Sequence, residues 1–243
     1  MTEKIIPNKE RLKSIEDNFK AINERIANAA AAANRNVQDV RLMAVTKTVE
    51  SVYINHAIGL GANLIGENRV QEYLGKKDEL MLDGVEKHLI GHLQTNKVKQ
   101  IVGEVDMIES VDSVKLAKEI SRVSAIKGLT TNILVEVNVG KEASKSGIYA
   151  EELEELLIEI SQMENIKIKG LMTIPPICES QAEAGRYFEA MHRAFADIKD
   201  KRLPNIDMDI LSMGMSGDFE EAVKHGSNIV RVGSAIFGAR KYF

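Results

Sequence analysis

A lysine closes the first long apolar run of the chain. Lys47 follows residues 42–46, Leu-Met-Ala-Val-Thr. A lysine at the end of a buried strand often only extends its ammonium group to water over an apolar stem. The same amine, partly buried beside another cation, loses its proton more easily and can form a Schiff base with an aldehyde. The position of Lys47 alone leaves both roles open.

Two loops rich in small residues lie near the end of the sequence. Residues 212–218 read Ser-Met-Gly-Met-Ser-Gly-Asp, and residues 231–238 read Arg-Val-Gly-Ser-Ala-Ile-Phe-Gly. Glycines let backbone N–H groups approach an anion closely, while serine hydroxyls and a helix dipole add to the attraction. Ser216 and Ser234 could also be ordinary helix N-caps. Because two such loops occur together, we favour a phosphate site over a pair of caps.

A phosphate site that faces a lysine at a strand end indicates pyridoxal phosphate (PLP), which binds lysine as a Schiff base. Arg231, at the start of the second loop, would then lie near the pyridine nitrogen. A guanidinium there disfavours protonation of the nitrogen and weakens the ring as an electron sink. Such a site holds PLP but is poorly suited to vigorous amino-acid chemistry. The alternative role of Arg231 is a structural ion pair with a carboxylate such as Asp209.

These residues must be positioned by the strands that precede them. Short β-branched runs alternate with helical patterns along the chain, which predicts parallel strands joined by right-handed crossovers. The predicted strands are residues 40–46, 63–66, 88–91, 105–110, 133–138, 166–172, 207–213 and 229–233. The predicted helices are residues 9–33, 50–60, 70–82, 96–102, 114–126, 150–163, 181–199 and 219–225.

Eight strand units in 243 residues predict an α/β fold, a single (β/α)₈ TIM barrel with an extra N-terminal helix, since about 250 residues is typical of that fold. A doubly wound open sheet uses the same alternation, but its glycine-rich fingerprint should follow the first strand. The nearest match, Gly59-Leu60-Gly61, precedes a strand and is typical of a helix end. In a barrel, the loops after the strands form the functional face, which is where Lys47 and both small-residue loops belong.

The composition excludes several other classes of protein. With 32 Lys and Arg against 36 Asp and Glu, the chain lacks the basic excess of a nucleic-acid binder. One cysteine, Cys178, cannot form an internal disulfide, and the charged residues 1–20 do not resemble a signal peptide. No stretch reaches the ~20 apolar residues of a membrane helix. We therefore expect a cytoplasmic protein that binds neither nucleic acid nor membrane. His88 and His92 lack the context of a metalloprotease motif, and we assign no metal site.

Several strings of residues resemble a known family, in order, from the first predicted strand to the C-terminus. They are residues 44–48 (AVTKT), 66–72 (GENRVQE), 88–97 (HLIGHLQTNK), 144–147 (SKSG), 170–172 (GLM), 211–216 (LSMGMS) and 230–240 (VRVGSAIFGAR). Together they closely resemble the pyridoxal phosphate homeostasis proteins.

The resemblance implies one PLP-binding barrel domain over residues 1–243, similar to the N-terminal domain of alanine racemases, with PLP on Lys47. It also implies that Arg231 meets the pyridine nitrogen and that Asn68 lies near the cofactor. The residues that it implies for the phosphate are Ser212, Met213, Ser216, Gly233 and Ser234. The chain departs from the family pattern at Ser234, where threonine is frequent, and at Gly217, where an acidic residue is common.

The resemblance further implies a protein that buffers and delivers intracellular PLP and affects amino-acid and keto-acid balance, without established enzymatic turnover. Its expected partners are PLP and apo forms of PLP-dependent enzymes, and we expect a monomer. A small PLP-dependent racemase is the alternative, with Lys47 and His92 as its two bases, although alanine racemases use a second domain that nothing after Phe243 supplies. A third hypothesis is a barrel that binds a phosphorylated metabolite or a protein partner without a covalent cofactor.

Overall fold

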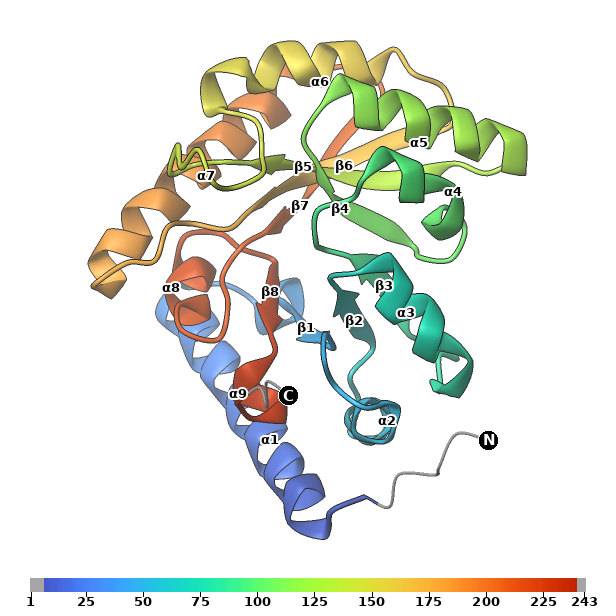
Figure 1. Cartoon of the computed structure of the whole chain (residues 1–243). Helices are drawn as coiled ribbons and strands as arrows, with labels where there is room; N and C mark the ends of the chain where they lie inside the picture. Colours follow the sequence, from blue (N-terminus) through green and yellow to red (C-terminus); the bar gives the residue numbers. More distant parts are fainter. Residues whose placement is uncertain (1–6, 240–243) are drawn as a thin grey trace.

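Eight parallel strands close into a barrel (Figure 1). The computed structural model of the chain describes residues 7–239. Each strand pairs with the next one, and β8 closes the barrel against β1, where Arg41 lies opposite Ile229 and Ala44 opposite Val232. The strands are β1 (Arg41–Val45), β2 (Leu64–Glu67), β3 (Glu86–Leu89), β4 (Met107–Val111), β5 (Thr131–Val137), β6 (Ile166–Thr173), β7 (Ile206–Ser212) and β8 (Ile229–Val232). The predicted barrel is confirmed, and every strand boundary lies within two residues of its predicted place.

The helices cover the outside of the barrel. They are α1 (Lys9–Ala32), α2 (Ser51–Gly59), α3 (Val70–Lys76), α4 (Val98–Ile101), α5 (Val114–Lys127), α6 (Leu153–Ser161), α7 (Gln181–Lys201), α8 (Phe219–Lys224) and α9 (Ser234–Phe237). Three helices predicted as continuous are instead divided between α-helix and 3₁₀-helix. The 3₁₀ segments are Lys77–Glu79 after α3, Thr95–Lys97 before α4 and Ala150–Glu152 before α6. Among residues 7–239, no helix is both long enough and apolar enough to cross a bilayer.

Helix α1 is the predicted extra helix that precedes the first strand in the sequence. The side chain of Asn8 caps it by accepting hydrogen bonds from the amides of Glu10 and Arg11. Its apolar face packs against α2, α8 and α9, and Figure 1 shows it running beside α8 and α9. The buried residues of that face are Ile15, Ile22, Ile26, Ala29 and Ala30. This packing brings the start of α1 to the end of the barrel where the strands finish.

The interior of the barrel is partly apolar and partly charged. Met43, Leu64 and Ile229 belong to one apolar cluster, and Met107, Leu134 and Met172 form another. Between them lie polar side chains that are also buried, namely His88, Glu109, Glu136, Ser212 and Arg231. Charged groups inside a barrel are costly unless they are paired and hydrogen-bonded. The hydrogen-bond and ion-pair partners of these side chains are therefore described with the site.

Candidate functional site

A cavity of about 1000 Å³ opens at the C-terminal ends of the strands. Its lining comes from the ends of β1 and β8, from the loops after β1, β2, β3, β6, β7 and β8, and from the first turns of α1. Six of the sequence-predicted site residues lie in that lining: Lys47, Asn68, Ser216, Arg231, Gly233 and Ser234. The fold therefore brings together groups that are up to 187 positions apart in the sequence, as between Lys47 and Ser234.

Lys47 lies two residues after the end of β1, and the backbone on both of its sides is held by hydrogen bonds. The amide of Thr46 donates to the carbonyl of Gly66 over 2.9 Å, and its hydroxyl donates to Oε2 of Glu67 over 3.1 Å. The amide of Thr48 donates to the carboxylate of Glu72, and Thr48 adopts a left-handed backbone conformation with φ of 61°. Lys47 is thus presented from a segment whose backbone is fixed, with its side chain half-buried at the cavity.

Glu67, Glu72 and Lys76, called here the Lys76 cluster, provide this support. The ammonium group of Lys76 lies 2.5 Å from Glu67 and 3.1 Å from Glu72, and it donates to the carbonyl of Thr46 over 2.8 Å. Burial raises the pKa of Glu67, and the charge of Lys76 opposes that rise. The side chains of Lys76 and Glu67 are only 11% and 2% exposed, so the cluster is an ion pair inside the protein.

Asn68 presents an unsatisfied acceptor at the cavity. Its Oδ1 atom is buried and has no hydrogen-bond partner among the described residues. The backbone N–H of Asn68 donates to Oε1 of Glu67 over 2.8 Å. Gly91 packs closely against the Asn68 backbone: a Cβ at position 91 would lie 2.3 Å from the backbone carbonyl oxygen of Asn68. A buried polar atom without a partner is costly, and at a cavity wall it indicates a donor on a ligand.

The two small-residue loops contact each other across the cavity wall. The hydroxyl of Ser216 accepts hydrogen bonds of 3.4 Å from the amides of Gly233 and Ala235. Helix α8 is capped by Asp218 and α9 by Gly233, so the N-cap alternative for the two serines is wrong. The amides of Ser216, Gly217 and Ser234 have no hydrogen-bond acceptor within residues 7–239. They are therefore available to an anion.

Arg231 is buried in the barrel wall beside these loops. Its Nη1 donates to the hydroxyl of Ser212 over 2.8 Å, and its Nη2 donates to the carbonyl of Thr173 over 2.7 Å. Burial lowers the pKa of Arg231, while the nearby carboxylates oppose the shift, and an arginine stays charged in any case. The alternative ion pair with Asp209 is wrong, because Asp209 pairs with Lys169 at 3.5 Å and its side chain is 62% exposed, whereas Arg231 is buried and hydrogen-bonds to Ser212 and Thr173.

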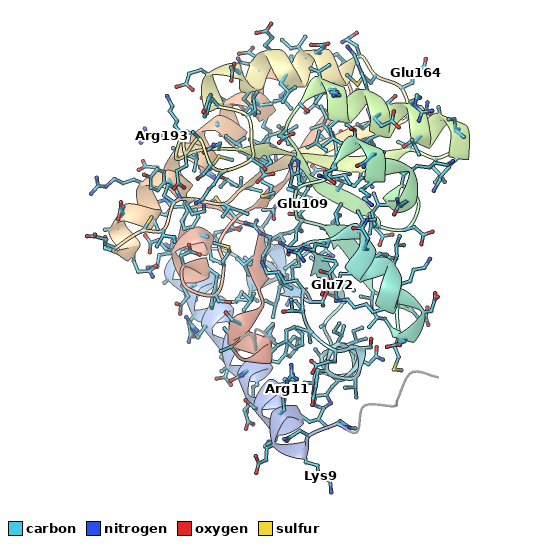
Figure 2. The ribbon with its side chains drawn as sticks, viewed as in Figure 1. Lys9, Arg11, Glu72, Glu109, Glu164 and Arg193 are labelled. Carbon is cyan, nitrogen blue, oxygen red and sulfur yellow. The ribbon has the colours of Figure 1, made fainter. Side chains whose placement is uncertain are left out.

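Behind Arg231 lies a series of polar side chains, of which only Ser212 was assigned to the site from the sequence. Glu86, His88, Glu109 and Ser212, called here the His88 chain, come from β3, β4 and β7. Ser212 donates to Oε2 of Glu109 over 2.6 Å, and the ring of His88 lies 2.6 Å from Glu109 and 2.7 Å from Glu86. Figure 2 labels Glu109 near the middle of the barrel. No short-range pattern marks Glu86, His88 or Glu109 as residues of this series, because each is an ordinary polar residue within its own strand.

The remaining predicted residues lie outside the cavity lining. Ser212 and Met213 are fully buried behind the wall, and the Ser212 hydroxyl is occupied by Glu109 and Arg231. His92 is 56% exposed, with its Nδ1 atom 3.3 Å from the hydroxyl of Ser146. Among the described residues, no group of His, Cys, Asp and Glu side chains is arranged to hold a metal.

Helix α1 contributes residues that sequence reasoning did not place at the site. Asn8, Arg11 and Ser14 line the cavity. Arg11 pairs with Glu50 at 3.0 Å, and its guanidinium carbon lies 3.8 Å from the centre of the Tyr53 ring, a distance at which a cation is attracted to the ring face. The amphipathic pattern of α1 predicted packing onto the protein but carried no information on which end of the barrel it would reach.

Comparisons with known proteins agree with this geometry. Residues 14–241 match the family model of the alanine racemase N-terminal domain. The pyridoxal phosphate homeostasis protein of Aquifex aeolicus is 41% identical, over 90% of this chain and 95% of its own length. The protein of the same name from Pseudomonas aeruginosa is 39% identical, over 95% of this chain and 98% of its own.

A solved structure extends the agreement to the fold. PipY from Synechococcus elongatus, determined with PLP bound, is 33% identical to this chain and has a TM-score of 0.77, with coverage of 88% of this chain and 100% of that one. This level of identity extends over nearly the full length of both chains, so the similarity includes the whole barrel and its loops. The chain belongs to the pyridoxal phosphate homeostasis protein family, whose barrel is that of the alanine racemase N-terminal domain.

Proposed function

We propose that this protein binds PLP as a Schiff base on Lys47 and that it buffers and delivers PLP inside the cell. The observation that carries the proposal is the meeting of Lys47, Arg231 and the two small-residue loops in one cavity. Two members of its family are named for PLP homeostasis, and PipY has been determined with PLP bound. We propose that the whole chain acts as one PLP-binding domain.

The described residues fit each part of the PLP molecule. The free amides of Ser216, Gly217 and Ser234 suit a phosphate dianion. The unsatisfied Oδ1 of Asn68 suits a hydroxyl or a protonated nitrogen. Arg231 uses both terminal nitrogens on protein acceptors, which leaves its Nε–H without a partner among the described residues and available to the ring nitrogen.

PLP supplies an electron sink when it is bound, and the residues around this cavity restrain that chemistry. Arg231 carries a buried positive charge beside the proposed position of the ring nitrogen, so it disfavours a proton there. His92, the second base of the racemase alternative, lies outside the cavity lining with its ring against Ser146. These two placements support a carrier of PLP over a racemase.

The proposal extends to partners and location. We propose that apo forms of PLP-dependent enzymes receive the cofactor, that the protein acts as a monomer, and that it works in the cytoplasm. A Schiff base is reversible, so a carrier with one can release PLP to an enzyme that binds it more tightly. The wide cavity, about 1000 Å³, leaves room for a competing amine to reach Lys47.

Visible spectroscopy tests the proposal. The purified protein, titrated with PLP, should develop visible absorbance that Lys47→Ala abolishes. Lys118→Ala is the matched control, since Lys118 is 64% exposed and, within residues 7–239, pairs only with Glu159 across the surface. The loaded protein should then restore the activity of an apo PLP-dependent enzyme on mixing. A colourless wild-type protein, or equal colour in Lys47→Ala, would overturn the Schiff-base proposal.

Hydrogen exchange at the α carbon separates the carrier from the racemase. We expect L-alanine and L-serine, incubated with the loaded protein in deuterium oxide, to gain no more deuterium than with Lys47→Ala. Exchange at an ordinary enzymatic rate in the wild type alone would favour the racemase.

A further inference from the structure

The His88 chain runs through the barrel interior. It extends from the end where the strands begin to the cavity at the end where they finish. Glu86 is the first residue of β3, and it pairs at 2.5 Å with Arg41, the first residue of β1. Arg231, at the other end of the series, lines the cavity. Because all strands are parallel, these two ends lie at opposite ends of the barrel, and the chain connects them through side chains alone.

The direction of each hydrogen bond is determined by the groups present. An ionised Glu109 can only accept, so the Ser212 hydroxyl donates to it. The lone pairs of that hydroxyl therefore face Arg231, whose Nη1 donates to it over 2.8 Å. Although burial opposes a positive charge, hydrogen bonds to Glu109 and Glu86 raise the pKa of His88 to about 9. His88 is thus an imidazolium at neutral pH, held between two carboxylates.

With Arg41 and Arg231 at its two ends, the His88 chain alternates in charge, with three positive groups against two negative ones. Glu86 and Glu109 are negative, while Arg41, His88 and Arg231 are positive. Burial of Glu109 favours its neutral form, but the hydrogen bond from His88 and the charge of Arg231 lower its pKa overall. A single buried carboxylate beside Arg231 would neutralise it, and the extra His88 and Glu86 are not needed for that purpose. Their effect is to keep Glu109 charged and in place.

We propose that Glu109 is a positioning residue, which holds Arg231 through Ser212 so that the guanidinium keeps one orientation toward the ring nitrogen of bound PLP. The inference rests on the proposed function, since it assigns a role within the PLP site. It also gives Ser212 a role that differs from a phosphate contact. The carbonyl of Thr173 fixes the second arm of the guanidinium, and Ser212 is the only side chain among the described residues that hydrogen-bonds to Arg231.

Other charged groups that face Arg231 provide a control. Glu136 on β5 and Asp218 before α8 interact with it electrostatically, without a hydrogen bond to it among the described residues. Burial raises the pKa of Glu136 to about 7, and Asp112 adds to the rise. At pH 6 Glu136 is therefore mostly protonated, so Glu136→Gln changes neither the charge nor the hydrogen bonds around Arg231. It is a buried substitution matched to Glu109→Gln.

The test compares PLP with pyridoxal, which lacks the phosphate, by equilibrium titration at pH 6. Ser212→Ala removes the link without removing a charge, and we expect it to weaken both ligands about tenfold, the effect of one lost hydrogen bond to a charged group. Glu109→Gln should weaken both ligands, and the double variant should bind no more weakly than Ser212→Ala alone. Glu136→Gln should bind as the wild type does. Melting of each apo variant shows whether it is folded.

The pH dependence of the visible spectrum distinguishes the positioning role from a purely structural one, because a purely structural role of Ser212 would not shift the pH of a spectral transition. When the guanidinium is no longer held beside the ring nitrogen, that nitrogen gains its proton more easily. We expect the acid-side spectral transition of loaded Ser212→Ala to move to higher pH by about one unit. An unchanged transition together with unchanged affinity in a folded Ser212→Ala protein overturns the inference.

The remaining outcomes separate this inference from the proposed function. Weaker PLP binding with unchanged pyridoxal binding in Ser212→Ala would assign Ser212 to the phosphate and overturn the positioning role. Additive losses in the double variant would show that Glu109 acts independently of Ser212 and would also overturn it. A wild-type protein that binds neither PLP nor pyridoxal overturns the proposed function itself. If the wild type binds both and the variants bind equally well, only the positioning role of Glu109 is overturned.

Discussion

Replacement of Lys76 by methionine removes the charge that holds the backbone on both sides of Lys47. The ammonium group leaves three acceptors behind, and of the two carboxylates Glu67 is the more deeply buried, at 2% exposure against 25% for Glu72. Loss of one partner from a buried ion pair costs about 3–5 kcal/mol, because the other charge stays in the protein without compensation. We therefore expect Lys76→Met to lower the free energy of unfolding by about that amount in urea at neutral pH.

The loss should depend on pH in one direction. Burial already raises the pKa of Glu67, and removal of Lys76 removes the charge that opposes this rise. The folded variant then binds a proton that the unfolded chain has released, so its stability falls as pH rises from the unfolded pKa of about 4.5 through the folded value. The deficit relative to the wild type should accordingly shrink at low pH, where Glu67 is protonated in both states.

A second substitution separates charge from shape. Lys76→Met with Glu67→Gln removes both charges of the pair and should recover most of the lost stability, since a neutral amide can keep hydrogen bonds with Thr46 and Asn68 without the cost of an unpaired buried charge. Urea unfolding of the apo wild type and the two variants across pH 4 to 8 measures the three free energies of unfolding. A deficit that does not change with pH, or a double variant less stable than Lys76→Met, would refute the reasoning.

Other predictions concern the cavity wall and the barrel interior. Asn68→Leu should weaken PLP about tenfold by titration while the apo protein loses no stability, because the lost oxygen has no partner in the part of the chain that the structure describes; full affinity would contradict this role. Gly91→Ala should cost about 1–3 kcal/mol in urea unfolding, since its Cβ would lie 2.3 Å from the Asn68 carbonyl oxygen, and wild-type stability would count against that contact. The imidazolium of His88 stabilises the fold fully below its unfolded pKa of 6.5, and this contribution is lost as pH rises through about 9. His88→Gln should therefore abolish the fall in unfolding free energy between pH 7 and 10, and an equal slope in both proteins would contradict it.

The strands and the residues that directly follow them could be predicted from the sequence. Lys47 and Arg231 are contiguous with their strands, so their place at the mouth of the barrel follows once the barrel is predicted. Ser216, Gly233 and Ser234 are positioned by the same rule. These residues could be placed from the sequence because each lies where the chain leaves a strand, and in a barrel this end of the strands is the functional face.

The groups that act across strands could not be predicted in this way. Glu109 reaches Ser212 across 103 positions of sequence, and their contact depends on side chains that cross the barrel interior. Arg11 reaches the cavity only because α1 packs against α8 and α9. Lys76 looks like an ordinary helix residue until its ammonium group is seen on the Thr46 carbonyl. Such contacts depend on tertiary packing, which leaves no periodic signal in the sequence.

The covalent attachment of PLP is the central claim, and reductive trapping tests it most directly. Borohydride reduction of the PLP-loaded protein, followed by proteolysis and mass spectrometry, identifies the lysine that carries the pyridoxyl group. We predict one modified peptide, with the label on Lys47, which lines the cavity together with Arg231 and Ser234. A label on another lysine in the loaded wild-type protein, or no label at all, would contradict the account.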